Sequence, residues 1–125
     1  IVNSEGLRVG KSIMNCDRRE SIILVDCLSM WITNLMMTTR DVHVEIRNLL
    51  STIKACSGEI IFVSNEVGFG IIPENAMARE FRDHSGLLHQ QLAATSKNVV
   101  MMIAGIPLII KGKNEISENT KGFEK

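Results

Sequence analysis

The sequence has few cysteines, prolines and aromatic residues: three cysteines, two prolines and an aromatic content of 4%. Cys16, Cys27 and Cys56 are odd in number and too far apart to form the C-x-x-C pairs of metal or redox sites. Such cysteines are typical of reduced thiols in a cytoplasmic protein. We expect Cys27 and Cys56 to be packed inside, where thiols behave as small apolar groups.

The sequence also has no net charge, since 14 basic residues balance 14 acidic ones. This balance gives no argument for binding to nucleic acid or to a membrane surface. The apolar run at 99–110 is interrupted by Gly105 and Pro107, so no run reaches the length of a membrane span. No signal peptide is visible, and we expect a cytoplasmic protein. A chain of 125 residues with 45% hydrophobic content fits one soluble globular domain.

Three short apolar runs, at 21–26, 59–64 and 98–104, predict β-strands. Each run is continuously apolar rather than alternating, which is typical of strands buried on both faces of a parallel sheet. A fourth strand is predicted at 107–111, at an edge of the sheet, with Pro107 at its start.

Helical patterns lie between these strands. The first is at 28–36, the second begins after Asp41 as N-cap and ends near Gly58, and the third spans 74–95. The inward positions expected in the third helix are Met77, Phe81, Leu88 and Leu92. The order of elements predicts right-handed β-α-β units in a three-layer α/β domain at 1–111, followed by a polar tail at 112–125.

The first candidate site residue is Asp26, which ends the first apolar run. Ligands of such folds bind beyond the carboxyl ends of the strands. An apolar strand ending in Asp is the Walker B pattern, in which the carboxylate holds Mg²⁺ beside nucleotide phosphates, directly or through water. The alternative is an aspartate that only caps the following helix.

The second run leads into a glycine-bearing segment, SNEVGFGIIPEN, at 64–75. Asn65 and Glu66 are expected at the mouth of the sheet, and Gly68 and Gly70 allow the loop to approach a ligand closely. The alternative is a plain connector, but two polar groups followed by an apolar loop favour a binding loop.

The third helix carries further charged candidates, Arg79, Arg82 and Asp83. Arg79 and Asp83 are four residues apart and therefore share a face. One interpretation is a surface ion pair between them, worth about 0.3–0.5 kcal/mol. The other is that the arginine faces an anionic substrate. The methionines Met30, Met36 and Met37 and the neighbouring Trp31 are most simply core or subunit contacts.

The segment EGLRVGKS at 5–12 contains the last three residues of a phosphate-binding loop, Gly10, Lys11 and Ser12. Glu5 stands where the first glycine of that motif belongs, and almost no strand precedes it. The residues alone leave two interpretations: a phosphate loop or part of an ordinary helix.

Taken together, the stretches VDCLSMWITNL, FVSNEVGFGIIPENAMAREFRDHSGLLHQQLA and VVMMIAGIPLIIK resemble the cobinamide kinase/cobinamide-phosphate guanylyltransferase family, over about 21–111. The resemblance implies a cytoplasmic enzyme with a P-loop, RecA-like parallel sheet, commonly assembled as a trimer. It implies phosphorylation of adenosylcobinamide by ATP or GTP. It further implies transfer of GMP from GTP through a guanylylated histidine.

The same resemblance assigns roles by position. One alignment places Glu5 on a family glutamate that contacts guanine nucleotide. This alignment continues to Asp26 without a gap. It puts Gly10, Lys11 and Ser12 on a helix, with the Lys11 side chain in solvent. Asp26 would then hold Mg²⁺ or nucleotide. The remaining cleft residues would be Asn65, Glu66, Arg79, Arg82 and Asp83. His89 and Leu87 depart from the family pattern in the third helix.

In this alignment the N-terminal strands, the phosphate loop and the guanylylated histidine of the family are missing. His43, His84 and His89 all match other parts of the family. The leading hypothesis is therefore a kinase and guanylyltransferase of cobalamin biosynthesis whose site is only partly carried by this chain. The second is a catalytically inactive assembly subunit of the same family. The third is an unrelated P-loop nucleotidase that uses Gly10, Lys11 and Ser12.

Overall fold

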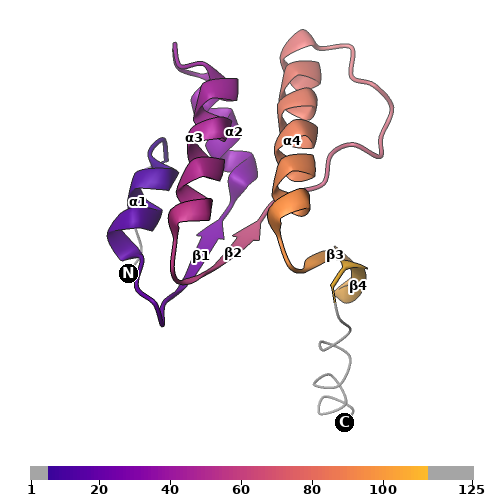
Figure 1. Ribbon diagram of the computed structural model, residues 1–125. Coiled ribbons are helices and arrows are strands. Elements are labelled where there is room, and N and C mark those ends of the chain that lie inside the picture. Colours follow the sequence, from indigo (N-terminus) through magenta and orange to yellow (C-terminus); the bar gives the residue numbers. More distant parts are fainter. Residues whose placement is uncertain (1–5, 113–125) are drawn as a thin grey trace. The chain divides into compact units, whose positions relative to one another are not determined.

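The computed structural model describes residues 6–112, in which helices and strands alternate (Figure 1). The elements are α1 Val9–Cys16, β1 Ile22–Asp26, α2 Leu28–Met36, α3 Val42–Ala55, β2 Glu59–Val63, α4 Ala76–Thr95, β3 Val99–Ile103 and β4 Ile106–Lys111. The chain clusters into two compact units, Ile1–Leu88 and His89–Lys125, and each is described by itself. The expected boundary between the domain and a tail at 112–125 stays a prediction. None of the helices in the described part is long and apolar enough to cross a membrane.

The first unit contains a pair of parallel strands, β1 and β2. Ile22 lies opposite Glu59, and Asp26 lies opposite Val63. Both strands and their parallel pairing were predicted from the apolar runs. The connection through α2 and α3 is the crossover that parallel strands require. The protein is thus a mixed α/β structure with a small parallel sheet.

The third predicted strand does not join this sheet. Among the described residues β3 pairs with β4 in a separate antiparallel sheet, in which Ile103 lies opposite Ile106. The chain reverses at Ala104 and Gly105, whose φ angles are 51° and 77°. Two consecutive residues with positive φ make the tight hairpin turn that matches strand twist, so the nearest partner of β3 is the strand that follows it.

Side-chain caps fix where two of the helices begin. The Asp41 carboxylate accepts hydrogen bonds from the backbone N–H groups of His43, at 2.8 Å, and Val44, at 3.1 Å, which confirms the predicted cap. The Asn75 side chain accepts from Ala78 N–H, at 3.2 Å, so α4 begins at Ala76 rather than at 74. Helix α3 ends at Ala55, before the Gly58 expected from the sequence.

The core of the first unit is built mainly from α2 and α3. Trp31 is 3% exposed, and its Nε1–H donates a hydrogen bond to the carbonyl oxygen of Leu7, at 3.3 Å. The other buried apolar side chains of these helices are Leu28, Ile32, Leu35, Val42, Ile46 and Leu49. The buried apolar residues of both helices recur at helical spacing, so each helix has one inward face.

Several predicted core positions are wrong. Met77, expected to point inward, is 48% exposed. Met30 in α2 and Met37, which directly follows α2, are exposed, so a core contact is wrong for both and a subunit contact stays a prediction. Cys27 and Cys56 are half-buried rather than packed inside, and both are free thiols. Desolvation raises the pKa of Cys56, with a further contribution from the charge of Asp17.

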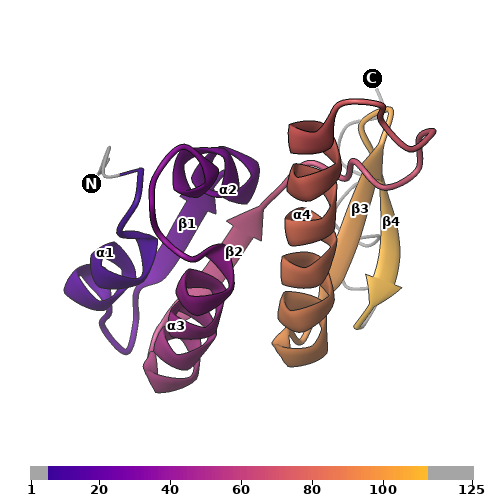
Figure 2. The same ribbon diagram turned by 90° about the horizontal axis from the view of Figure 1, so that it is seen from above.

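Gly10, Lys11 and Ser12 lie within α1, so the interpretation of these residues as a phosphate loop is wrong. Helix α1 packs beside α3 (Figure 2). A Cβ on Gly10 would lie 3.1 Å from Thr52 Oγ1, which indicates that a small residue is needed for this contact. Lys11 is exposed, as the helical alignment predicted.

Asp17 joins the segment before β1 to the segment before β2. Its carboxylate accepts hydrogen bonds from Ser57 Oγ, at 2.9 Å, from Gly58 N–H, at 2.8 Å, and from Ser57 N–H. The backbone hydrogen bonds from Ser57, followed by the one from Gly58, lower the pKa of Asp17. This contact sets the starting points of the two parallel strands side by side.

Two glycines are expected to respond in opposite directions to alanine. A Cβ at Gly58 would meet Ser21 Oγ and lie 2.6 Å from the carbonyl oxygen of Arg18, so Gly58→Ala requires a backbone shift. We expect it to destabilise the protein by about 1–3 kcal/mol. A Cβ at Gly86, inside α4, would have no neighbour within 4 Å, and Gly86→Ala is expected to stabilise by about 0.5–1 kcal/mol. Urea unfolding of both variants measures this, and equal effects would contradict the packing described at Gly58.

Candidate functional site

Polar side chains follow both parallel strands at their carboxyl ends. Asp26 is the last residue of β1, and Asn65 and Glu66 come two and three residues after the end of β2. Since Asp26 and Val63 are opposite each other, the two strand ends lie at the same edge of the sheet (Figure 1). The structure therefore brings Asp26, Asn65 and Glu66 to one edge, the usual ligand-binding side of such sheets.

Asp26 is exposed, and its carboxylate makes no hydrogen bond or ion pair within residues 6–112. The N-cap position of α2 is Cys27, and no side chain caps that helix. The alternative role of Asp26 as a helix cap is therefore wrong. A carboxylate that has no protein partner at a strand end is chemically suited to accept from water or to contact a cation.

Ser29 fixes the start of the loop that follows β2. Its hydroxyl is buried in the first turn of α2, accepts a hydrogen bond from Asn65 N–H at 2.9 Å and lies 3.3 Å from Ser64 Oγ. Asn65 is thereby held next to the first turn of α2, which begins two residues after Asp26. Sequence reasoning missed Ser29, because a serine in the first turn of a helix carries no signal for a partner 36 residues away.

Arg79 and Arg82 of α4 hold the loop itself. Arg82 donates from Nη2 to the carbonyl oxygen of Gly68, at 3.0 Å, and Arg79 donates to the carbonyl oxygens of Pro73, at 2.9 Å, and Glu74. The Glu66 carboxylate accepts from Gly68 N–H. Each guanidinium has five N–H donors, so both arginines keep donors for a further acceptor while they position the loop.

Of the two interpretations of Arg79 and Asp83, the ion pair is not formed among residues 6–112, because Arg79 is turned toward the loop carbonyls. Asp83 is exposed on the same helix. Its predicted place in the cleft stays a prediction. Glu5 lies outside the described residues.

The loop exposes large apolar side chains. Phe69 is 81% exposed and Ile71 is 96% exposed, and Ile72 is exposed as well. Isolated exposed apolar residues are common, but three within four positions form a patch of the kind that contacts a ligand or a partner. The interpretation of the segment as a binding loop rather than a connector stays a prediction.

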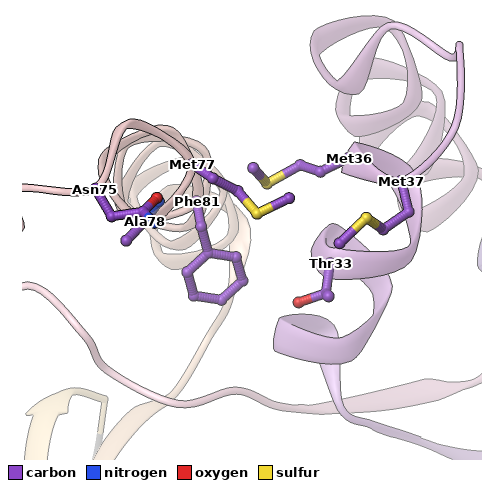
Figure 3. A pocket seen from close by; sticks show the side chains of 7 residues that line it. All are labelled: Thr33, Met36, Met37, Asn75, Met77, Ala78 and Phe81. Carbon is purple, nitrogen blue, oxygen red and sulfur yellow. The ribbon is translucent and has the colours of Figure 1, made fainter.

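An apolar pocket of about 320 Å³ lies between the end of α2 and the start of α4 (Figure 3). The side chains of Met36 and Met77 point toward each other across it, with Phe81 beneath them. The remaining lining residues are Thr33, Met37, Asn75 and Ala78. The volume is at the small end of ligand pockets, and methionine side chains adapt to differently shaped apolar groups. The predicted inward position is wrong for Met77; Met37, predicted as a core or subunit contact, is not in the core, and its role as a subunit contact stays a prediction.

The histidines do not gather at the sheet edge. The rings of His43 and His84 are in edge contact, with centroids 5.0 Å apart, and His84 Nε2 lies 3.5 Å from Glu80 Oε1. His84 is buried. No cluster of three or more His, Cys, Asp or Glu side chains able to hold a metal occurs in the part of the chain that the structure describes.

A single carboxylate still fits the needs of Mg²⁺ in a nucleotide site. Mg²⁺ keeps several of its waters and is bound by one or two carboxylates together with the phosphates of the substrate. Asp26, exposed and without a protein partner among the described residues, provides one such carboxylate. The residues present therefore fit a nucleotide-bound Mg²⁺ better than a metal held by the protein alone.

The fold and the polar strand ends define a mixed α/β protein with a small parallel sheet whose carboxyl end carries polar side chains. Residues 2–110 match the model of the family described as cobinamide kinase/cobinamide phosphate guanyltransferase. The chain belongs to this family, whose members are kinases and guanylyltransferases of cobalamin biosynthesis, and the P-loop NTPase fold is that of the family.

Curated relatives agree with this assignment. The chain is 38% identical over 93 residues to the bifunctional adenosylcobalamin biosynthesis protein CobP of Pseudomonas aeruginosa. It is 32% and 34% identical to the proteins named CobU of Escherichia coli and Salmonella typhimurium, over 105 and 107 residues. These matches cover 73%, 72% and 74% of this chain, but only 54%, 58% and 59% of the relatives. The chain thus spans less than two thirds of the length of these relatives.

Proposed function

We propose that this chain provides part of the active site for the two reactions of its family: phosphorylation of adenosylcobinamide by ATP or GTP, and transfer of GMP from GTP to adenosylcobinamide phosphate. The observation that carries the proposal is the exposed carboxylate of Asp26, without a partner among residues 6–112, beside Asn65 in a chain whose residues 2–110 match the family. Phosphoryl transfer depends mainly on positioning and on neutralisation of charge.

Asp26 is the residue proposed to orient the metal of a Mg²⁺–nucleotide complex, directly or through a bound water. The Mg²⁺ ion, when bound, neutralises charge on the phosphate oxygens. Asn65 is proposed to donate a hydrogen bond from its side-chain amide to the nucleotide or to the substrate hydroxyl. Glu66 shapes the turn at Gly68 and lines the cleft with it.

Arg79 and Arg82 are proposed to keep the loop in place and to face phosphate with their remaining donors. Asp83 would line the outer part of the cleft, and Glu5 would contact the guanine of GTP. Assembly as a trimer in the cytoplasm, and a three-layer RecA-like architecture, belong to the same proposal.

A chimera tests this function most cleanly. The matched region of the Escherichia coli relative is replaced by that of this chain, and formation of adenosylcobinamide phosphate and incorporation of labelled GMP are measured. We expect both products to form. Asp26→Asn in the chimera is expected to lower both rates by about 10- to 100-fold, the loss seen when a residue in the outer coordination shell of a metal is replaced.

The matched control is Glu20→Gln, which removes a carboxylate charge from an exposed turn before the opposite end of β1. The control is expected to retain full rates. A chimera that makes neither product, or an Asp26→Asn variant as active as the control, would contradict the proposed function.

The second candidate is a catalytically inactive assembly subunit. The exposed Phe69 and Ile71 of the loop, together with the open pocket at Met37 and Met77, favour it, because such apolar surface is suited to a partner chain. An inactive chimera that still assembles with the intact relative would select this candidate over the first.

A further inference from the structure

Ser29 is a buried polar residue in the first turn of α2, three residues after Asp26. A serine near a helix start usually bonds to the backbone of its own helix. The N-cap of α2 is Cys27, however, and no side chain within residues 6–112 caps this helix. The Ser29 hydroxyl instead accepts a hydrogen bond from the backbone N–H of Asn65, at 2.9 Å, and lies 3.3 Å from Ser64 Oγ. Its side chain therefore serves the segment after β2.

This contact begins where the pairing of the two parallel strands ends. The last paired residues are Asp26 and Val63, so the sheet fixes the backbone only as far as this pair. Beyond Asp26 the chain enters α2, and β1 has no residue left to pair with Asn65. A backbone N–H requires an acceptor, and the Ser29 hydroxyl provides one at this point. Ser29 thus determines how the chain leaves β2.

The same contact links the two polar strand ends of the candidate site. Asp26 ends β1, Ser29 follows three residues later, and Ser29 holds the backbone of Asn65. All three residues belong to the first compact unit of the chain. With the backbone of Asn65 held, its side chain is left with only the few directions that its staggered rotamers allow.

We propose that Ser29 is a positioning residue of the candidate site, which holds the Asn65 backbone so that the Asn65 amide and the Asp26 carboxylate reach the same ligand. This inference rests on the proposed function and adds to it a residue that acts only through Asn65. A displacement of about 1 Å at a reacting group can lower a rate by about 100-fold, so the loss of this contact is sufficient for a measurable effect.

The alternative role for Ser29 is to stabilise the fold alone. Its side chain is 7% exposed, and a buried hydroxyl with a hydrogen-bond partner contributes to stability wherever it occurs. The two roles predict different results, because a contribution to stability does not depend on whether Asn65 carries an amide side chain. A positioning role requires that amide.

The first measurement uses the ¹⁵N-labelled 125-residue chain and follows hydrogen exchange of the Asn65 backbone amide. Ser29→Ala removes the acceptor, and we expect this amide to exchange at least about tenfold faster. Ser29→Thr keeps a hydroxyl at the same position and is expected to restore slow exchange. Equal exchange in the parent chain and in Ser29→Ala would overturn the proposal, because another group would then hold Asn65.

The second measurement is a double-mutant cycle on both reaction rates of the chimera, at a temperature at which circular dichroism shows every variant to be folded. Ser29→Ala and Asn65→Ala are each expected to lower the rates by about tenfold or more. With Asn65→Ala already present, the addition of Ser29→Ala is expected to change the rates by less than about twofold, because the positioned amide is gone. Ser29→Thr is expected to retain the rates of the parent chimera.

The matched control is Thr33→Val, which removes another hydroxyl from α2. The Thr33 hydroxyl donates to the carbonyl oxygen of Ser29, at 3.0 Å, so its hydrogen bond stays within the helix, and the control is expected to retain full rates. Additive effects of Ser29→Ala and Asn65→Ala, or a Ser29→Ala chimera as active as the control, would overturn the positioning role alone. A parent chimera that forms neither product would refute the proposed function, and this inference with it.

Discussion

Incubation of the 125-residue chain with labelled GTP and Mg²⁺ is expected to give no stable covalent GMP adduct. In the proposed transfer, an imidazole nitrogen attacks the α-phosphorus of GTP, a P–N bond forms and pyrophosphate leaves. The family resemblance implies that this histidine belongs to a segment with no counterpart in the sequence. Among the three histidines present, His84 is buried against His43 and beside Glu80, which leaves little room for attack on a triphosphate.

The measurement is incorporation of label from GTP into an acid-labile protein adduct, followed by peptide mapping to locate the labelled residue. The chimera with the Escherichia coli relative is expected to incorporate label, at a histidine outside the matched region. The largest contrast predicted for this protein is therefore between labelled chimera and unlabelled chain. An acid-labile adduct on His43, His84 or His89 of the isolated chain would show that the nucleophile is present here after all.

Leu35→Ala is expected to lower the free energy of unfolding by about 2–5 kcal/mol. Leu35 is 0% exposed in the α2 core, so truncation leaves a cavity that its neighbours cannot fill. Trp31 is the only tryptophan and is 3% exposed one turn away on the same helix, so its fluorescence reports the transition directly. Small domains have a total stability of about 5–15 kcal/mol, and this one change is a large fraction of it.

Met37→Ala provides the matched control for the same region of the chain. Met37 is 66% exposed at the end of α2, and its truncation is expected to change stability by less than about 0.5 kcal/mol. A loss at Met37 as large as that at Leu35 would mean that Met37 is covered in solution, and would contradict the core assigned to α2.

Much of the local structure could be predicted from the sequence. Apolar runs located β1 and β2, and the Asp41 cap located the start of α3, because strand burial and helix capping depend on residues close in the chain. The position of Asp26 and Asn65 at the carboxyl ends of the two strands followed from the predicted parallel order of these strands. The helical state of Gly10 and Lys11 was predicted from the family alignment, because the residues alone left a phosphate loop and a helix open.

The pairing of β3 could not be predicted in the same way. A continuously apolar strand fits a parallel sheet and a hairpin equally well, and the outcome was decided by the turn at Ala104 and Gly105. The runs of β1 and β2 predicted burial on both faces, yet one face is open.

The contacts of the site were the least predictable part. Spacing placed Arg79 beside Asp83, but the guanidinium contacts the loop carbonyls at Pro73 and Glu74 instead. The Ser29 hydroxyl accepts a hydrogen bond from the backbone N–H of Asn65, which is 36 residues away in the sequence. Such contacts depend on how loops are placed in three dimensions, and no local propensity specifies them.

The central claim is that Asp26 faces a bound nucleotide at the edge of the sheet. The most direct test is nuclear magnetic resonance of the ¹⁵N-labelled chain with GTP and Mn²⁺ in place of Mg²⁺, because the paramagnetic ion broadens the signals of nearby amides. We expect broadening at 26–27 and 64–66 and unchanged signals at 10–12. Unchanged signals at Asp26 and Asn65, or broadening confined to Gly10, Lys11 and Ser12, would contradict the claim.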